Sequence, residues 1–209
     1  MSSYKAVISR FKNKKILVIG DVILDRYIQG SVSRISPEAP VPVVLEERSV
    51  YQPGGAANVA HNLAVLGAKA VQIGRIGNDF EGQLLKRALK NKNIAIDGIV
   101  LDKSVSTITK TRVLAQHQQI VRIDKEVSGE DLRGPLLNKV KNFIQEKMEK
   151  ADAVIISDYG KGMITPDLVS VITGLAIQKG IPVTVDPKVE HFRCYRNVTC
   201  ITPNLKEAE

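Results

Sequence analysis

The chain has 209 residues, of which 44% are apolar and 25% are charged, and this composition is typical of a folded globular protein. Two cysteines are too few for a disulfide framework or a zinc cluster. No apolar run approaches the length that crosses a bilayer, and residues 1–15 lack the apolar block of a secretory signal, so we expect a cytoplasmic protein with no membrane partner. The net charge of +8 is compatible with a phosphorylated ligand; we expect no nucleic-acid partner, because Trp is absent and no aromatic residues alternate with basic ones for base stacking.

Apolar runs and helical patterns alternate along the chain. Short apolar runs predict strands buried on both faces at 15–20, 70–73, 153–156 and 182–185. Capping residues and helical periodicity predict helices between them, at 56–66, 79–89, 129–150 and from 165 to the glycine at 180. This alternation predicts an α/β fold in three layers, with a mostly parallel sheet between helices.

Two segments depart from this alternation. Residues 27–51 contain three prolines and β-branched runs, and residues 96–124 include alternating stretches at 107–113 and 120–123. Such patterns indicate antiparallel strands. We expect both segments to contribute to one small separate sheet that serves as a lid or a dimer surface.

Several common nucleotide-binding and metal-binding motifs are absent from the sequence. The only Gly-Lys pair, Gly160-Lys161, is followed by glycine and so does not make a phosphate loop. No Gly-x-Gly-x-x-Gly follows the first predicted strand, and no His-Glu-x-x-His occurs. If the protein binds a nucleotide, the site is therefore built from residues other than these motifs.

Carboxylates and glycines lie where an α/β sheet binds its ligands. Asp21 ends the first predicted strand and Asp25 follows it, so their carboxylates could accept hydrogen bonds from neighbouring hydroxyls; the alternative is an aspartate that caps a turn. Gly54-Gly55 opens a predicted helix with Asn58 in its first turn, and the free N–H groups there suit a polar ligand. The alternative is a tight turn before a helix packed closely on the sheet.

Spaced motifs together are similar to those of the ribokinase-like (PfkB) carbohydrate kinases. The resemblance rests on Gly54 to Ala60 with Gly67 and Gly77, on the block 74–82, and on the block 202–207. It implies a ribokinase-like fold whose sugar is held by Asp21, Asp25, Gly54, Gly55 and Asn58. It also implies ATP as co-substrate and Mg²⁺ as cofactor, with Asn204 and Lys206 near the nucleotide and Glu207 binding the metal through water. Thr202 departs from the family's Asn at the first position of the last motif.

Residues 33–43 resemble the family members that phosphorylate the anomeric hydroxyl of D-glycero-β-D-manno-heptose 7-phosphate. Residues 157–162 and 185–188 fit the same members, which make ADP-heptose for lipopolysaccharide. A sugar phosphate needs cations, and our candidates are Lys161, Lys188 and Arg112; the alternative for each is a solvated surface charge. The resemblance also implies a homodimer through the small sheet, and in many relatives an adenylyltransferase domain is fused to the kinase.

The family's catalytic base is an Asp in a Gly-Ala-Gly-Asp motif, which residues 1–209 do not contain. We therefore assign no catalytic residue in this chain, expect the base beyond residue 209, and expect 1–209 to be an incomplete kinase domain that is inactive alone. Two alternatives stay open. One is another sugar kinase of the family, and the other is a non-catalytic module that binds sugar phosphate or dimerises.

Overall fold

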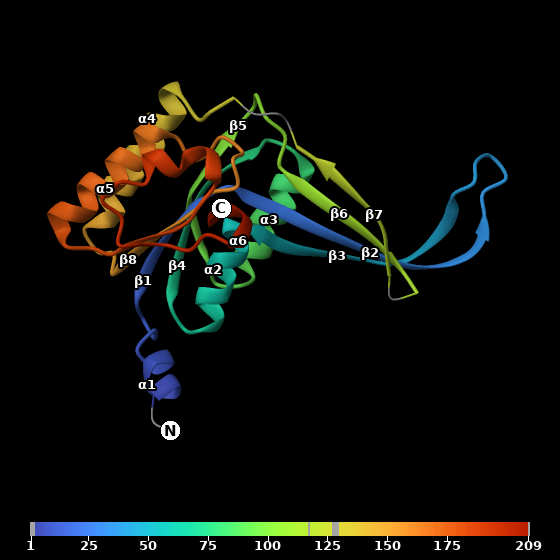
Figure 1. The fold of residues 1–209 in the computed structure, drawn as a ribbon, viewed down its shortest axis with the longest axis horizontal. Coiled ribbons are helices and arrows are strands. Elements are labelled where there is room, and N and C mark those ends of the chain that lie inside the picture. Colours follow the sequence, from blue (N-terminus) through green and yellow to red (C-terminus); the bar gives the residue numbers. More distant parts are fainter. Residues whose placement is uncertain (1–2, 117, 127–129, 209) are drawn as a thin grey trace.

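A computed structural model describes residues 3–116, 118–126 and 130–208, and its strands form two sheets (Figure 1). The main sheet has six strands in the order β10-β9-β8-β1-β4-β5, and every neighbouring pair is parallel. The strands are β1 (Lys15–Gly20), β4 (Lys69–Gly77), β5 (Ala95–Asp102), β8 (Ala153–Ser157), β9 (Val183–Asp186) and β10 (Cys200–Ile201). The four strands predicted from apolar runs all lie in this sheet.

Helices cover both faces of the main sheet, as the alternation predicts. One face carries α2 (Ala56–Val65) and α3 (Phe80–Lys90), and the other carries α4 (Gly134–Met148) and α5 (Pro166–Lys179). In β1, Leu17 and Ile19 pack in the cluster with α4 and α5, whereas Val18 packs with α2 and α3. The apolar run of β1 is continuous because both of its faces are buried.

The helix ends follow local capping chemistry, with one difference. The side chain of Asp79 caps α3 and that of Thr165 caps α5, while Gly180 ends α5 in the left-handed conformation. Of the helix expected at 129–150, residue 129 lies outside the described residues, residues 130–133 are not helical, and α4 begins at Gly134 with a proline in its first turn. Leu132 explains the delay, because it is buried and its N–H donates to the carbonyl of Gly162, so the chain is held in a non-helical path before α4. Short helices are α1 (Ser3–Ser9), η1 (Val189–Cys194) and α6 (Leu205–Ala208).

A second sheet, which we call the small sheet, projects from the body of the molecule (Figure 1). Its order is β3-β2-β6-β7, from β2 (Val22–Ile35), β3 (Pro42–Gly55), β6 (Thr109–Ala115) and β7 (Gln118–Lys125). The β2–β3 and β6–β7 pairs are antiparallel, whereas β2 and β6 are parallel. Residues 96–102 were expected in this sheet, but they form β5 at the edge of the main sheet. Ile96, Ile99 and Val100 are buried there against the helices, which explains the difference.

The order of the main sheet contains a topological switch point between β1 and β8. From β1 the chain builds β4 and β5 on one side, and then returns to build β8, β9 and β10 on the other. Gly20 at the end of β1 lies opposite Ser157 at the end of β8, so Asp21 and Asp158 follow side by side. Ligands of open α/β sheets bind at such a point, beyond the carboxyl ends of the strands. No helix in the described part of the chain is long and apolar enough to span a membrane.

Candidate functional site

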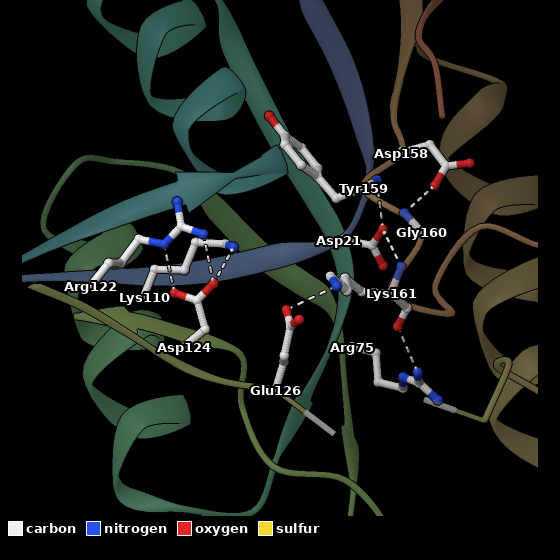
Figure 2. A network of polar contacts seen from close by, with 10 residues as sticks. All are labelled: Asp21, Arg75, Lys110, Arg122, Asp124, Glu126, Asp158, Tyr159, Gly160 and Lys161. Atoms are coloured by element: carbon white, nitrogen blue, oxygen red, sulfur yellow. Dashed lines mark hydrogen bonds and ion pairs between the residues drawn. The ribbon is translucent and has the colours of Figure 1, made fainter. Parts of the chain in front are cut away.

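The carboxylate of Asp21 organises the loop that follows β8, residues 158–163 (the 158–163 loop). Oδ2 accepts hydrogen bonds from the backbone N–H groups of Tyr159 at 2.9 Å and Lys161 at 3.1 Å (Figure 2). Oδ1 accepts one from the N–H of Met163 at 3.1 Å. Burial raises the pKa of Asp21, although these three N–H donors act in the opposite direction. The structure therefore shows Asp21 capping a loop, and its sugar-binding role stays a prediction.

Arg75 holds the same loop from its other side. Its Nη2 donates to the carbonyl of Lys161 at 3.1 Å and its Nη1 donates to the carbonyl of Glu130 at 2.9 Å. The guanidinium also lies 3.5 Å from Asp102 at the end of β5, and the side chain is only 6% exposed. A small cavity at this point is lined by Asp21, Arg75, Val105, Ser106, Ile108, Lys161 and Met163.

Both predicted phosphate-binding lysines, Lys161 and Lys188, lie at the 158–163 loop. Lys161 Nζ is 2.9 Å from Glu126 Oε2, just beyond the end of β7, so this ion pair joins the loop to the small sheet (Figure 2). Carbons of the Lys188 side chain lie 3.3 Å from where a Cβ on Gly160 would be. The structure thus brings Lys161 and Lys188, which are far apart in the sequence, to the same loop.

A buried network below the loop supports it. Asp158 Oδ2 accepts the hydroxyl of Tyr195 at 2.5 Å and lies 2.6 Å from His191 Nδ1, while Oδ1 accepts the N–H of Gly160 at 2.8 Å. Burial and the hydrogen bond to Asp158 raise the pKa of Tyr195. Lys188 immediately precedes η1, and its N–H donates to Tyr195 Oη, so this network also fixes the backbone of Lys188.

Asp25 and Arg112 form a second group where the small sheet meets the body. Asp25 Oδ1 lies 2.5 Å from Arg112 Nη1, and the guanidinium stacks over the ring of Tyr27 with its carbon 5.3 Å from the ring centre. Both charged side chains are partly exposed, at 18% for Asp25 and 24% for Arg112. The hydrogen bond to Asp25 raises the pKa of Arg112. In contrast to Asp21, Asp25 keeps a carboxylate that a ligand could reach.

The two glycines before α2 are required by these aspartates. A Cβ on Gly54 would lie 2.3 Å from Asp25 Oδ2, so a larger residue would displace the carboxylate from its place beside Arg112. Gly55 has φ of +55°, and a Cβ on it would lie 2.5 Å from the carbonyl oxygen of Asp21. Gly54 and Gly55 therefore form the tight turn before a closely packed helix, which was the alternative to ligand binding in the sequence analysis. Asn58 is exposed in the first turn of α2, so its side chain could reach a ligand, whereas Ala56 and Ala57 before it are buried.

Asn204 and Glu207 bond to each other at the start of α6. The N–H of Asn204 donates to Glu207 Oε2 at 2.8 Å, and the N–H of Glu207 donates to Asn204 Oδ1 at 3.1 Å, which makes a reciprocal capping box. Lys206 is exposed beside them. Burial together with the charges of Glu207 and Asp158 raises the pKa of Asp186, so negative charge accumulates beyond the ends of β8 and β9.

The sequence of the chain matches an established family. Residues 13–209 match the profile described as pfkB family carbohydrate kinase. The chain belongs to this family. It is 44% identical over 196 residues to the Bifunctional protein HldE of Helicobacter pylori (strain P12), and 46% identical over 208 residues to that of Gluconobacter oxydans (strain 621H). These matches cover 94% and 97% of this chain but 42% of each relative, so the chain spans less than half the length of these PfkB relatives.

Solved structures confirm the ribokinase-like fold of this PfkB chain. Phosphofructokinase-2 from Escherichia coli, in complex with substrates and products, matches with a TM-score of 0.69 and 21% identity, covering 93% of this chain and 61% of that one. Arabidopsis thaliana ribokinase complexed with ribose and ATP matches with a TM-score of 0.66 and 16% identity, covering 94% and 61%. At these identities the likeness concerns the fold alone.

The acidic group at α6 is chemically suited to the Mg²⁺ that a PfkB kinase implies. Glu207 and Asp158 each repel the charge of Asp186, and a cation would relieve this repulsion. Within the described ranges, no three His, Cys, Asp or Glu side chains are placed to bind a metal ion together. Mg²⁺ commonly keeps several of its waters and binds through phosphates, so Glu207 and Asp186 fit a metal held through water.

Sequence reasoning assigned no role to several residues of this PfkB site. Arg75 lies in the 74–82 block that carried the family resemblance, and a cation at the carboxyl end of a predicted strand was a usable signal. Glu126 had no such signal, because only the three-dimensional structure brings it to Lys161. The same holds for His191 and Tyr195, which lie outside the quoted motifs and meet Asp158 through η1.

Proposed function

We propose that the protein carrying this chain transfers the γ-phosphate of ATP to the anomeric hydroxyl of D-glycero-β-D-manno-heptose 7-phosphate. Membership of the PfkB family and 44–46% identity to HldE proteins support a heptose-phosphate kinase. The observation that carries the proposal is the pair Lys161 and Lys188 beside one loop at the switch point, because a substrate with a phosphate needs cations there. The product, a 1,7-bisphosphate, would feed ADP-heptose synthesis for lipopolysaccharide.

In this proposal the sugar hydroxyls bind at the base of the small sheet. Asp25 accepts hydrogen bonds from hydroxyl groups, and Asn58 donates or accepts at the start of α2. Gly54 and Gly55 let the sugar approach the backbone closely. Arg112 orients Asp25 and adds positive charge toward the phosphate. The small sheet, as a lid, excludes water from the reacting groups.

The nucleotide would bind next to α6. Asn204 and Lys206 would contact its phosphates, and Glu207 with Asp186 would hold Mg²⁺ through water, where the metal neutralises phosphate charge during transfer. No residue of 1–209 is assigned as the base that removes the proton of the anomeric hydroxyl. The family's Gly-Ala-Gly-Asp motif supplies that base, so we expect this chain to bind substrate and a full-length protein to turn it over.

Titration calorimetry with heptose 7-phosphate, fructose 6-phosphate, ribose and ATP tests the proposal. We expect the chain to bind heptose 7-phosphate most tightly among the sugars. We expect Lys188→Ala to weaken binding of heptose 7-phosphate about tenfold, because one charge-assisted contact is lost, and to change ATP binding little. A preference for fructose 6-phosphate or ribose would favour another kinase of the family, and equal small effects on both ligands would contradict the role of Lys188.

A full-length protein decides between a kinase and a binding module. We expect ATP-dependent formation of the 1,7-bisphosphate there; tight binding without turnover in a protein that continues past residue 209 would support the non-catalytic module. We also propose a homodimer through the small sheet, an adenylyltransferase domain in the same protein and a cytoplasmic location. The unpaired state of Cys194 and Cys200 supports the last of these.

A further inference from the structure

The backbone of Lys161 is held on both sides by buried charges of opposite sign. Its N–H donates to the Asp21 carboxylate and its carbonyl accepts from the Arg75 guanidinium, at 3.1 Å each. The Asp21 carboxylate also accepts hydrogen bonds from the N–H groups of Tyr159 and Met163, near the two ends of the loop. The Cα of Lys161 therefore has little freedom, and its side chain leaves the loop in one direction (Figure 2).

The hydrogen bonds explain the positions of the Asp21 carboxylate and the Arg75 guanidinium. A gain in folding stability does not by itself explain why both charges are buried. Taking a carboxylate and a guanidinium out of water costs free energy that their contacts only partly recover. Asp21 is 2% exposed, and Arg75 divides its donors among the carbonyls of Glu130 and Lys161 and the carboxylate of Asp102. Both charges act on the one loop that carries a candidate phosphate-binding lysine.

Unlike its backbone, the ammonium of Lys161 is available for exchange. Its side chain is 28% exposed and that of its partner Glu126 is 32% exposed. The distance of 2.9 Å is typical of an ammonium bonded to any anionic oxygen, in a carboxylate or in a phosphate. Because water reaches the pair, a phosphate could replace Glu126 without any rearrangement of the clamped loop.

We propose that Asp21 and Arg75 are positioning residues, which fix the backbone of Lys161 so that its ammonium meets the phosphate of the sugar phosphate, and that Glu126 holds this ammonium until the phosphate replaces it. This inference rests on the proposed function. It gives Asp21 the role of fixing the 158–163 loop, instead of the sugar-binding role that the family resemblance implies. Its consequence is that Arg75, which touches no substrate, determines how strongly the site prefers a phosphorylated sugar.

The first test compares the affinities of heptose 7-phosphate and of the same heptose without its phosphate. In the wild-type chain we expect a preference for the phosphorylated sugar. Lys161→Ala and Arg75→Met should each reduce this preference about tenfold, because the lost contact is a charge-assisted one. The double variant should be no worse than Lys161→Ala, since Arg75 acts through Lys161. The matched control is Arg133→Met, an exposed arginine that also contacts Glu130, and it should leave the preference unchanged.

Each outcome of this comparison has a definite meaning. Equal losses for both sugars in Arg75→Met, or additive losses in the double variant, would overturn the positioning role and leave the proposed function standing. A wild-type chain that binds neither sugar would contradict the proposed function and, with it, the phosphate role of Lys161.

Two further measurements do not depend on whether Arg75→Met folds well. Glu126→Gln removes a competing carboxylate at the surface, and we expect it to tighten binding of heptose 7-phosphate severalfold without affecting the unphosphorylated sugar. Hydrogen exchange of the ligand-free chain should show faster exchange at Tyr159, Lys161 and Met163 in Asp21→Asn, while amides of α5 keep their protection. Unchanged affinity in Glu126→Gln, or unchanged exchange in Asp21→Asn, would overturn the corresponding part of the proposal.

Discussion

Asp79 connects a helix to a distant part of the chain through one carboxylate. It accepts the N–H of Gly82 at 2.9 Å, which caps α3, and also the N–H and the hydroxyl of Thr107 at 2.8 and 2.6 Å, in the segment that leads to β6. Burial opposes ionisation, but these hydrogen bonds and the charge of Lys125 outweigh it and lower the pKa of Asp79 below its ordinary 3.8. At the scale of a residue, Asp79, whose capping of α3 was predicted from the sequence, also fixes the segment just before β6 in the small sheet.

We expect Asp79→Ala to lower the free energy of unfolding at neutral pH by about 2 kcal/mol, because the cap is lost and the N–H of Thr107 loses its acceptor. A lowered pKa means that the ionised form stabilises the fold above pH 3.8, and that this contribution is lost as the pH falls through the lower folded value. The difference between wild type and variant should therefore shrink in acid. Urea unfolding across this pH range measures it, with the exposed Asp97→Ala as control; a difference that grows in acid would contradict the assignment.

At the scale of elements, the sequence predicts features that depend on neighbouring residues and misses those that depend on contacts between distant segments. The buried strands, the caps at Asp79 and Thr165 and the end of α5 were predictable, because each depends on residues within one or two turns. The start of α4 was not, since the bond from Leu132 to Gly162 joins segments that meet only in the fold. The site divides in the same way: its motif residues were predictable, whereas the partners of Arg75 and Lys161 come from distant loops.

Gly162 is an element-scale test of how tightly the 158–163 loop is packed. Its φ is +82°, and a Cβ would lie 2.8 Å from both Arg75 Nη2 and the carbonyl oxygen of Glu130. We expect Gly162→Ala to lower the free energy of unfolding by about 2 kcal/mol or more, from backbone strain and the displaced guanidinium. Gly134→Ala is the matched control, because φ is +60° there with no atom within 4 Å, so only strain of about 1 kcal/mol remains. Equal losses in chemical denaturation would show that Arg75 does not pack against Gly162 in solution.

At the scale of the molecule, the body and the small sheet differ in how their surfaces are covered. The central strands of the main sheet, β1, β4 and β8, are largely buried between two helical layers. In contrast, every residue of β7 is exposed, and Ile35, Val41 and Leu45 lie exposed in and near the β2–β3 hairpin. Exposed apolar side chains on a projecting sheet are typical of an association surface. This pattern supports the proposed dimer through the small sheet.

Leu45→Glu tests that dimer. Leu45 is 67% exposed, so we expect the variant to fold normally but to shift the chain from dimer to monomer, because a charge would be buried in the contact. The control is Val65→Glu, which changes a side chain 72% exposed at the end of α2 and should leave the dimer intact. Sedimentation velocity distinguishes the two states. A wild-type chain that sediments as a monomer, or two variants that stay dimeric, would argue against this interface.

The parallel pairing of β2 with β6 also sets an order of assembly during synthesis. Leu24 lies opposite Thr109, so one edge of β2 has no partner until the whole β4-α3-β5 unit has left the ribosome. A hairpin of two strands is only marginally stable in water, and pairings between distant residues form slowly. The β2–β3 hairpin therefore keeps one unpaired edge, on β2, while β4, α3 and β5 are synthesised. The small sheet beside the ligand site can therefore become ordered only after β4, α3 and β5 have been made.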